Sequence, residues 1–465
     1  MNRALSSLQR SLRRFRWRSS RFFDSSSPRV ARQSNAVSLP QRPPCSSITG
    51  LLPLSIAGGP EPPSLPVILC ILVGLPAALW MYKSLMMIIF QRKIIYMGYA
   101  PLGSRTEELA TDVRPDQLEG ISCKEISVLN STDGARLSGI LVQPAQFGSS
   151  DVSPDVVIVY FQGNAGNPLH RLPVFQSLLT SIRTHAPRRP RLSSTATNSP
   201  SIPKLIPINA AILAVAPRSY WKSTPRRPTQ RGILSDYRHV LEYAFTHFPD
   251  TPVVVYAHSL GGAIALCVLA QLSESPIPES RTTARPNGIG VSSDRSRQIQ
   301  GLILENPMAS IPRMVAALYP QRWVPYRYLT PFVWDRWDAL GAMKDASAGA
   351  RVMTTNDATR LTEAPSTLTR LARNMLVLVS EHDEVVPREM GAEIVEAASG
   401  IGGDERGMTL SKPTTSTGPR LVVVPGALHE NAWKKRQWER EVGTYVWGVM
   451  DAARRDKVKR KAEEG

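Results

Sequence analysis

The sequence predicts an α/β protein built on a mainly parallel, doubly wound sheet, and two patterns lead to this prediction. From about residue 156 onward, short apolar runs rich in β-branched residues alternate with longer helical periodicities. Strands that are apolar on both faces and separated by helices are typical of parallel sheets covered on both sides. Before this alternation, residues 126–128 and 137–142 flank the turn-forming pair Asp133-Gly134, which predicts an antiparallel hairpin opening the sheet.

The predicted strands share a length of three to seven residues, and most are followed by a predicted helix. They cover residues 156–161, 210–216, 253–256, 302–304, 375–379 and 421–424. Helices are predicted after Pro168, over about 233–248, directly after Gly262, from Arg388, and around Trp438 to Val449. Segments without periodicity interrupt the pattern and are predicted to be low-complexity surface insertions, at 185–207, 273–300 and 401–418.

Length and composition indicate one folded domain with additional segments, because the 465 residues include 39 prolines and several Ser/Arg/Pro-rich stretches. We expect six parts: a disordered basic tail or targeting segment (1–60), a transmembrane and interfacial segment (61–97), a core in two portions (98–306 and 374–456), a helical cap between them (307–373), and a basic tail (457–465). We expect the protein to be a monomer.

The net charge of +18 is concentrated in tails and insertions. Ten arginines and a single acidic residue lie within the first 44 residues, and further clusters lie at 187–191 and 457–461. No aromatic-interleaved basic motif accompanies this charge, so the sequence favours a membrane surface or a targeting role over nucleic-acid binding. Four cysteines, at positions 45, 70, 123 and 267, lie far apart without a C-x-x-C pair, so we predict no disulfide framework, no metal site and no cofactor.

Residues Leu65 to Tyr82 carry no charge and would extend about 27 Å as a helix, close to the thickness of a bilayer core. We therefore predict a single-pass membrane protein, with the second apolar stretch, 85–90, lying in the membrane interface. The basic amino terminus would remain cytosolic, which favours the endoplasmic reticulum and the secretory pathway. In that case Asn130, in an Asn-Ser-Thr sequence on a hairpin expected to be exposed, would accept a glycan. The Arg- and Ser-rich amino terminus also fits a mitochondrial presequence, with the inner membrane as the alternative location.

Ser259 lies at the corner between a predicted strand and a predicted helix, in the sequence Ala257-His-Ser-Leu-Gly261. Such a tight turn holds its serine in a strained conformation and leaves almost no room for side chains two residues before and after it. The small residues Ala257 and Gly261 occupy those two positions. The pattern resembles the nucleophile elbow G-x-S-x-G, with alanine in place of the first glycine, and makes Ser259 the candidate nucleophile.

A glycine-containing loop, residues 162–167, follows the first predicted parallel strand and could turn backbone N–H groups toward a developing oxyanion. In proteins with this type of elbow, one donor comes from that loop and one from the residue after the nucleophile. We therefore expect the backbone N–H groups of Asn164 and Leu260 to form an oxyanion hole. The loop lacks the third glycine and the Lys-Ser/Thr pair of a phosphate-binding loop.

A serine hydroxyl needs a base, and the expected order of serine, acid and histidine is present. Asp383 follows the strand predicted at 375–379, and His429 follows the strand predicted at 421–424. We assign His429 as general base and Asp383 as the residue that orients it. Neighbouring residues leave alternatives: Glu381 or Glu384 for the acid, and His258 or His382 for the base, although His258 is expected to be structural and His170 a polar helix residue without an obvious partner.

Several segments together resemble the fungal bud-emergence (Bem-type) family of membrane-anchored α/β-hydrolases, over about residues 65–450. The resemblance rests on residues 161–167 and 170–173, the elbow 258–262, the segments 302–307 and 382–387, and the apolar anchor ending at Tyr96. It implies the α/β-hydrolase fold and Ser259, Asp383 and His429 as a catalytic triad. Two departures concern the pocket mouth: Gln162 stands where the family usually has histidine, and residues 218–223 lack the two glycines of Arg-Gly-Tyr-Gly-x-Ser.

The sequence thus predicts a membrane-anchored serine hydrolase that cleaves an ester, a thioester or an amide through an acyl-enzyme. The alternative is a catalytically silent hydrolase fold that serves as a membrane scaffold. Aromatic residues concentrated in the predicted cap either pack it onto the core or line a pocket for an acyl or lipid-like substrate. These residues are Tyr319, Trp323, Tyr326, Tyr328, Phe332, Trp334 and Trp337.

Overall fold

The computed structural model describes residues 64–148, 152–185, 208–272, 293–354, 366–400 and 418–464. The chain divides into two compact units, residues 1–67 and 68–465, and the account below concerns the second. The predicted tail at 1–60 lies outside the described residues, together with Cys45 and most of the three predicted insertions.

An eight-stranded sheet forms the centre of this unit, with the strand order β1-β2-β4-β3-β5-β6-β7-β8. The pairs β1–β2 and β2–β4 are antiparallel, and the remaining neighbours are parallel, which confirms the predicted sheet and its opening hairpin. The strands are β1 (Ile121–Asn130), β2 (Ala135–Pro144), β3 (Val156–Phe161), β4 (Ala210–Val215), β5 (Val253–His258), β6 (Ile299–Glu305), β7 (Leu376–Ser380) and β8 (Arg420–Val424).

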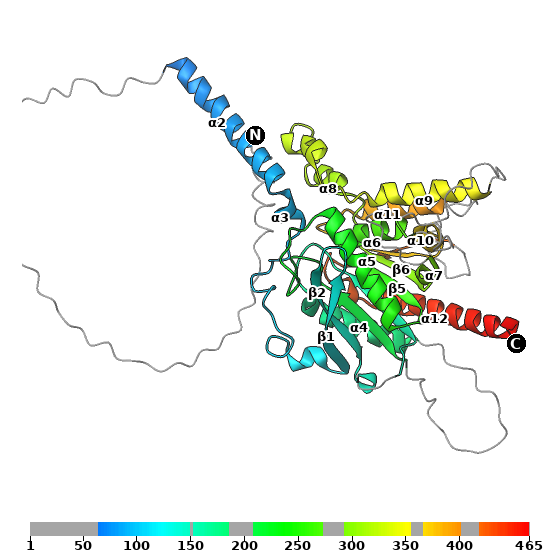
Figure 1. Cartoon of the computed structure of the whole chain (residues 1–465). Helices are drawn as coiled ribbons and strands as arrows, with labels where there is room; N and C mark the ends of the chain where they lie inside the picture. The colour runs from blue at the N-terminus through cyan, green and yellow to red at the C-terminus, as the bar shows by residue number, and fades with distance from the viewer. Residues whose placement is uncertain are drawn as a thin grey trace, which may run out of the picture. The chain divides into compact units, whose positions relative to one another are not determined.

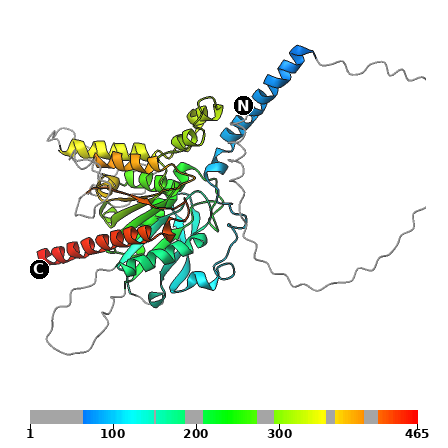
Figure 2. The same cartoon turned by 180° about the vertical axis from the view of Figure 1, so that it is seen from behind.

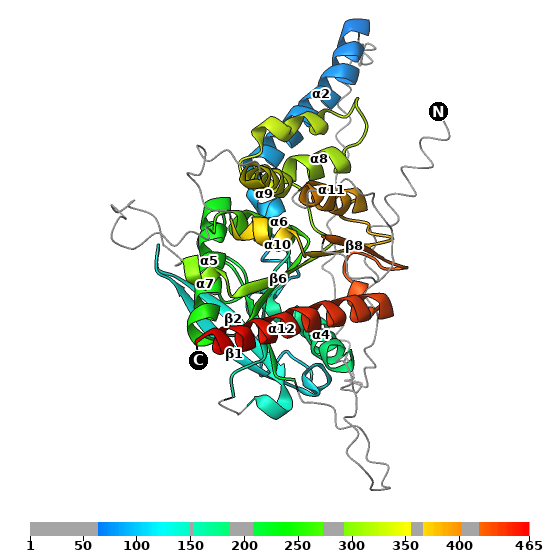
Figure 3. The same cartoon turned by 90° about the vertical axis from the view of Figure 1, so that its right-hand side faces the viewer.

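Helices cover both faces of the sheet (Figures 1 and 2). Figure 3 shows α4 (Leu172–Thr184) beside α12 (Arg436–Glu464) on one face. The opposite face carries α5 (Gln230–His247), α6 (Leu260–Ala270), α9 (Ala339–Thr354), α10 (Thr367–Ala372) and α11 (Arg388–Ser399). Shorter helices are α3 (Gln91–Ile95), η1 (Pro115–Leu118), η2 (Ala145–Phe147), η3 (Pro168–Arg171), α7 (Ser293–Ser296), α8 (Ile311–Leu318), η5 (Pro325–Phe332) and η7 (Ala432–Lys434).

The three central strands are buried along their whole length, which explains their continuous apolar sequence. Every residue of β3, β4 and β5 is buried. A strand covered by helices on both faces has no solvent-facing side on which polar residues would alternate. Because parallel strands end at the same edge of a sheet, this arrangement brings the loops after β3, β5, β7 and β8 to one edge.

The apolar segment before the sheet is one helix, α2 (Leu65–Ile89), with Pro76 inside it. Among the described residues it is the one helix long and apolar enough to cross a membrane. The stretch 85–90, predicted to lie in the membrane interface, belongs to this same helix, which continues through Lys83 to Ile89. A single lysine near a helix end interrupts the apolar pattern without interrupting the backbone hydrogen bonds, since its long side chain can reach polar surroundings.

Several predicted boundaries differ from the structure. The last residues of the insertion predicted at 273–300 belong to α7 and to the first part of β6. Helix α12 runs on to Glu464, past residue 456, where we predicted the core to end. Its last turns contain Arg, Lys, Glu and Ala, which are strong helix formers, so the helix continues without an apolar face to bury.

The prediction of an exposed glycan acceptor at Asn130 is wrong. Asn130 is the last residue of β1, and its side chain is fully buried. Its amide Nδ2 donates to Asp236 Oδ1 at 2.8 Å and to Ser235 Oγ at 3.1 Å, and its Oδ1 accepts from the N–H of Thr132. The nitrogen that would carry a glycan is therefore occupied inside the fold, and the Asn-Ser-Thr sequence serves to shape the hairpin turn.

Candidate active site

Ser259 lies between β5 and α6 with φ 56° and ψ −121°, a conformation that costs a non-glycine residue on the order of 1–3 kcal/mol. Its backbone is held on both sides, since its N–H donates to Glu305 O at 2.9 Å and its carbonyl accepts from Gly262 N at 2.9 Å. A Cβ atom at Gly261 would lie 2.2 Å from the carbonyl oxygen of Phe161, so this position requires glycine. The sharp strand-to-helix turn expected around Ser259 is therefore present.

Asp383 and His429 meet, although 46 positions separate them in the sequence. Nδ1 of His429 lies 2.8 Å from Asp383 Oδ2 and 3.0 Å from Oδ1, and both side chains are almost fully buried. Oδ1 of Asp383 also accepts from the N–H groups of Val385 and Val386, each at 2.8 Å. Backbone donors thus fix the carboxylate in the orientation that holds a proton on Nδ1 and leaves Nε2 of His429 free to accept one.

The neighbouring acidic residues brace the two loops and do not contact the imidazole ring through any hydrogen bond among the described residues. Glu381 Oε2 accepts from the N–H of Gly426 at 2.8 Å, and Glu384 Oε2 accepts from the backbone N–H of His429 at 3.1 Å. His382 is exposed and lies 3.7 Å from Glu381. Of the three candidate acids in this loop, Asp383 is the one paired with the side chain of His429.

The loop after β3 supplies the candidate oxyanion donors. The carbonyl of Asn164 accepts from Met97 N at 2.7 Å and from Tyr220 Oη at 3.0 Å, which fixes the loop at this residue. Leu260 is the first residue of α6, so its N–H is one of the four at a helix start without an intrahelical partner. A Cβ atom at Gly163 would lie 3.7 Å from Ser259 Cβ, so this loop passes directly beside the serine.

His258 supports the loop that carries His429. Its Nε2 lies 3.1 Å from the carbonyl oxygen of His429, and its Nδ1 lies 3.4 Å from Arg171 Nη2. A carbonyl can only accept and a guanidinium can only donate, so His258 is neutral with its proton on Nε2. Burial, together with the positive charge of Arg171, lowers the pKa of His258 to about 3.

Arg171 links this histidine to the surface, where its Nη1 donates to Glu430 Oε2 at 2.6 Å. We call His258, Arg171 and Glu430 the histidine brace. The possible ligand atoms of His258, His429 and Glu430 lie within 4.8 Å of one another, and the Arg171 guanidinium contacts two of these three residues. Arg171 lies in the segment 170–173 of the family resemblance, but no local pattern indicates its role, because its partners are 87 and 259 positions away.

Asn306 is a further buried residue of this edge, in the segment 302–307 that carries the family resemblance but for which no role was predicted. It follows β6 with φ 47°, and its Nδ2 donates to Ser380 Oγ and to His429 O, both at 3.0 Å. Its Oδ1 accepts from Ser380 N at 2.7 Å. Asparagine tolerates this left-handed conformation better than most residues, which was the available sequence signal. Asn306 therefore connects the ends of β6 and β7 to the histidine loop.

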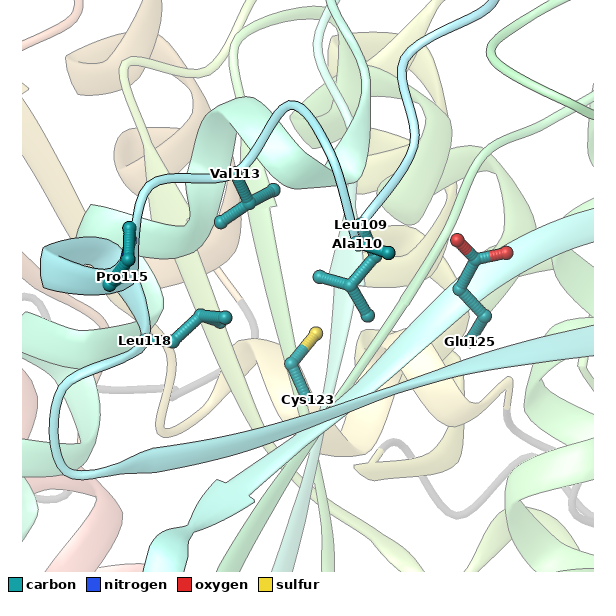
Figure 4. A pocket seen from close by; sticks show the side chains of 7 residues that line it. All are labelled: Leu109, Ala110, Val113, Pro115, Leu118, Cys123 and Glu125. Carbon is teal, nitrogen blue, oxygen red and sulfur yellow. The ribbon is translucent and has the colours of Figure 1, made fainter.

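A separate pocket of about 600 Å³ lies away from these residues, between the segment 109–118 and β1 (Figure 4). Cys123 and Glu125 on β1 line it together with Leu109, Ala110, Val113, Pro115 and Leu118. Burial raises the pKa of the Cys123 thiol to about 12, so this thiol stays protonated near neutral pH and is a poor nucleophile. The pocket therefore does not compete with Ser259 as a reaction centre.

The model of the alpha/beta hydrolase family matches residues 166–427, more than half of the chain. This chain belongs to the alpha/beta hydrolase family. It is 24 % identical to protein bem46 of Schizosaccharomyces pombe over 257 residues, which cover 55 % of this chain and 66 % of that protein. It is 26 % identical to the bovine lysophosphatidylserine lipase ABHD12 over 179 residues, 38 % of this chain and 36 % of that protein. These results confirm the resemblance to Bem-type hydrolases.

The chain thus spans no more than about two thirds of the length of these relatives. Among solved structures, the esterase PF2001 of Pyrococcus furiosus aligns with 72 % of this chain and 96 % of its own, at 13 % identity and a TM-score of 0.42.

Gln162 stands at the position where Bem-type relatives were expected to have histidine, and its side chain forms hydrogen bonds across the candidate oxyanion loop. Its side chain is buried, and Nε2 donates to Gly166 O at 2.7 Å and to Ala165 O at 3.3 Å. The backbone N–H of Gln162 donates to Tyr237 Oη at 2.9 Å. Glutamine therefore holds the carbonyl side of the loop at Ala165 and Gly166.

The second departure replaces two glycines, and the backbone keeps the conformation that glycine favours. Ser219 has φ 66° and Trp221 has φ 42°, both in the left-handed region. Trp221 is buried, and its Nε1 donates to Glu107 O at 2.8 Å, while Ser219 Oγ bonds to Arg226 O. Side-chain hydrogen bonds and burial offset the backbone strain, so the loop retains its path without glycine.

Two further expectations meet different outcomes. His170 has a partner after all, since its Nε2 lies 2.7 Å from Glu107 Oε2. Of the seven cap aromatics, Trp337 alone is buried, and its Nε1 donates to Tyr96 Oη at 2.8 Å. The other six are half-buried or exposed, so they are not part of the buried core.

Proposed function

We propose that this protein is a membrane-anchored serine hydrolase that cleaves an ester, a thioester or an amide of an acyl or lipid-like substrate. The observation that carries the proposal is the buried Asp383–His429 pair at the same sheet edge as the strained Ser259. A silent scaffold has no need to bury a carboxylate with two backbone donors beside an imidazole, because such a buried pair is costly to form. The name of the bovine relative, a lysophosphatidylserine lipase, supports a lipid-like substrate.

In the proposed reaction, Ser259 Oγ attacks the acyl carbon while His429 Nε2 takes its proton. Asp383 stabilises the imidazolium that forms, and the N–H groups of Asn164 and Leu260 bind the negative oxygen of the tetrahedral intermediate. His429 then returns the proton to the leaving alcohol, thiol or amine, which departs and leaves an acyl-enzyme. Water repeats the sequence, so each cycle consumes one water and releases one carboxylic acid and one leaving group.

Active-site labelling tests this proposal before any substrate is known. We expect a fluorophosphonate probe to label the full chain in membranes, to label Ser259→Ala not at all, and to label His429→Ala only near background. His382→Ala is the matched control, because His382 is an exposed histidine of the same site loops, and it should label like the wild type. A folded wild-type protein without any labelling would favour the scaffold alternative.

The location proposed for this hydrolase is a single-pass membrane protein of the endoplasmic reticulum or secretory pathway. The arginine-rich segment before α2 favours a cytosolic amino terminus, which places the hydrolase domain in the lumen. Protease added outside sealed microsomes should then leave the domain intact until detergent is present. Import of the chain into mitochondria would instead support the presequence interpretation.

A further inference from the structure

The stretch from Ile311 to Trp334, which we call the cap arm, is apolar and yet has no buried residue. It comprises α8, η5 and the turn between them. Its most exposed large side chains are Trp323 at 80 %, Leu318 at 62 %, Tyr328 at 61 %, Phe332 at 54 % and Trp334 at 50 %. Contiguous apolar surface of this kind on a soluble protein marks a contact with a partner or a membrane.

The composition of the cap arm identifies which contact is favoured. Its aromatic residues include tryptophan and tyrosine, which are enriched where protein meets the headgroup region of a bilayer. The arm carries three arginines, Arg313, Arg322 and Arg327, and no acidic residue. Arg313 pairs with Glu393 of α11, whereas Arg322 and Arg327 form no ion pair within the described part of the chain, so their charge is available to a negatively charged surface. Aromatic side chains interspersed with arginine are typical of segments that lie in a membrane interface.

The cap arm is also attached to the end of the helix that could cross a membrane. Lys83 of α2 lies over the ring of Tyr326, with Nζ 4.7 Å from the centroid. Gln91 of α3 donates through Nε2 to Phe332 O at 3.1 Å and accepts from Trp334 N at 2.8 Å. Arg92 pairs with Asp335 at 2.7 Å, just beyond the arm. The last turns of α2 and the start of α3 therefore hold the arm at the level where the chain would leave the bilayer.

We propose that the cap arm is a second membrane contact of this hydrolase, with its aromatic side chains inserted among the lipid headgroups next to α2. This inference rests on the membrane anchoring proposed above. The arm begins one residue after Ser310, and the preceding segment touches the nucleophile turn, where Met308 N donates to Ser259 O at 3.4 Å. An arm seated in the bilayer would place lipid molecules beside the segment that contacts the Ser259 turn, so the substrate would arrive from the membrane and not from water.

Depth-dependent quenching of a fluorescent dye tests the contact directly. The full chain, with its four cysteines replaced by alanine, would carry an environment-sensitive dye at Trp323→Cys and be reconstituted into phosphatidylcholine–phosphatidylserine vesicles. Lipids with a nitroxide on the acyl chain should lower the emission about twofold or more, while aqueous iodide has little effect. Leu129→Cys is the matched control, because Leu129 on β1 is also an exposed apolar residue, at 62 %. A dye at position 129 should be quenched by iodide and not by the lipid nitroxide.

A third labelled variant separates the possible failures. Gly74→Cys lies within α2 with no atom near its missing side chain, so the dye there reports whether α2 is in the bilayer. Lipid quenching at position 74 without quenching at 323 would overturn the cap-arm contact and leave the anchor intact. Quenching at neither position would overturn both. Iodide quenching at 323 as strong as at 129 would also contradict the proposal.

Hydrolysis of two different esters separates the contribution of the arm from the chemistry at Ser259. Trp323→Glu should lower hydrolysis of a long-chain ester embedded in vesicles about tenfold, because a charge opposes interfacial insertion. Hydrolysis of a short water-soluble ester by the same variant should stay within about twofold of the wild type. Equal losses on both esters would contradict the membrane contact. If the dye at position 323 is quenched by lipid but the wild-type protein hydrolyses neither ester, the membrane contact would stand and the proposed enzymatic function would be rejected.

Discussion

The loops around Ser259 and the cap arm are stabilised in opposite ways. In the loops, buried partners from several strands fix each functional group: the carbonyl of His429 accepts from both His258 and Asn306. In the cap arm no residue is buried. Specific buried hydrogen bonds position the residues of the loops, whereas the arm is characterised by its exposed apolar and basic residues. Single substitutions should therefore affect the loops strongly and the arm weakly, unless a membrane is present.

The largest expected effects concern the three residues of the proposed triad. Asp383→Asn should lower turnover on the order of 10⁴-fold, because an amide cannot hold the proton on His429 Nδ1 and accept from two backbone N–H groups at once. The measurement is kcat with any ester that the wild type cleaves. Ser259→Ala or His429→Ala should each cost nearly the whole triad effect, on the order of 10⁶-fold, and the losses should not add.

Glu381→Gln is the matched control for Asp383→Asn, since it removes a charge from the same loop. Its side-chain carbonyl can still accept from Gly426 N, so turnover should remain within about threefold of the wild type. Equal losses in both variants would mean that the charge of the whole loop, and not the Asp383–His429 contact, controls the base.

The next contrast compares two tryptophans of the cap region. Trp337→Ala should destabilise the detergent-solubilised protein by about 3–5 kcal/mol, because it removes a fully buried ring and leaves a cavity. Trp323→Ala should change the free energy of unfolding by no more than about 0.5 kcal/mol, because that ring is 80 % exposed. Chemical denaturation of the two variants gives both values, and a large cost at Trp323 would show that the arm packs against protein.

Periodicity and chain order were sufficient to predict the sheet and the residues of the candidate site. Central strands buried on both faces must be apolar throughout, and a nucleophile elbow must be flanked by small residues, so both leave local patterns around β5 and Ser259. No local sequence pattern distinguishes Asp383 from Glu381 and Glu384 as the acid. Spacing of one to two residues cannot show which carboxylate faces His429, because loop backbone geometry decides it.

The roles of residues that act through tertiary contacts could not be predicted either, because the fold and not the local sequence decides those contacts. Arg171 and Asn306 meet the histidine loop only after the sheet has formed. The error at Asn130 has the opposite origin: a local motif predicted exposure, but its contacts to Ser235 and Asp236 on α5 bury it. A motif shows which chemistry a residue could support, whereas burial decides whether that chemistry is accessible.

The acid stability of the site loops should depend on His258. Its pKa is about 3 in the folded protein, below the ordinary value near 6.5 of the unfolded chain, because of burial and of Arg171. Between these values the unfolded state binds a proton that the folded state does not, so stability is complete above about pH 6.5 and falls as the pH is lowered toward 3. At about 1.4 kcal/mol per pKa unit, the loss is of the order of a few kcal/mol.

The comparison of wild type with His258→Gln isolates this contribution from other titrating groups. Glutamine can still donate to His429 O but does not titrate, so the melting temperature of the variant should fall less steeply between pH 6.5 and pH 4. The charged or titratable groups facing His258 are Arg171, Glu430 and His429, and all remain in the variant. Parallel pH profiles for the two proteins would show that His258 does not set the acid sensitivity.

The smallest expected difference is between substitutions of Arg171 and Glu430 in the histidine brace. It tests how far the rigidity of the site extends toward the surface. The Arg171 side chain is 14 % exposed and contacts His258, whereas the Glu430 side chain is 59 % exposed. Arg171→Gln leaves Nδ1 of His258 without its cationic donor and should lower kcat about tenfold with little change in KM, since the effect reaches Ser259 only through the position of His429. Glu430→Gln removes a largely solvated partner, and exposed ion pairs contribute only about 0–1 kcal/mol, so kcat should change less than about threefold. If Glu430→Gln were as damaging as Arg171→Gln, the brace would extend to the surface as one unit, and the division between a geometrically fixed site and a weakly constrained exterior would have to be placed beyond Glu430.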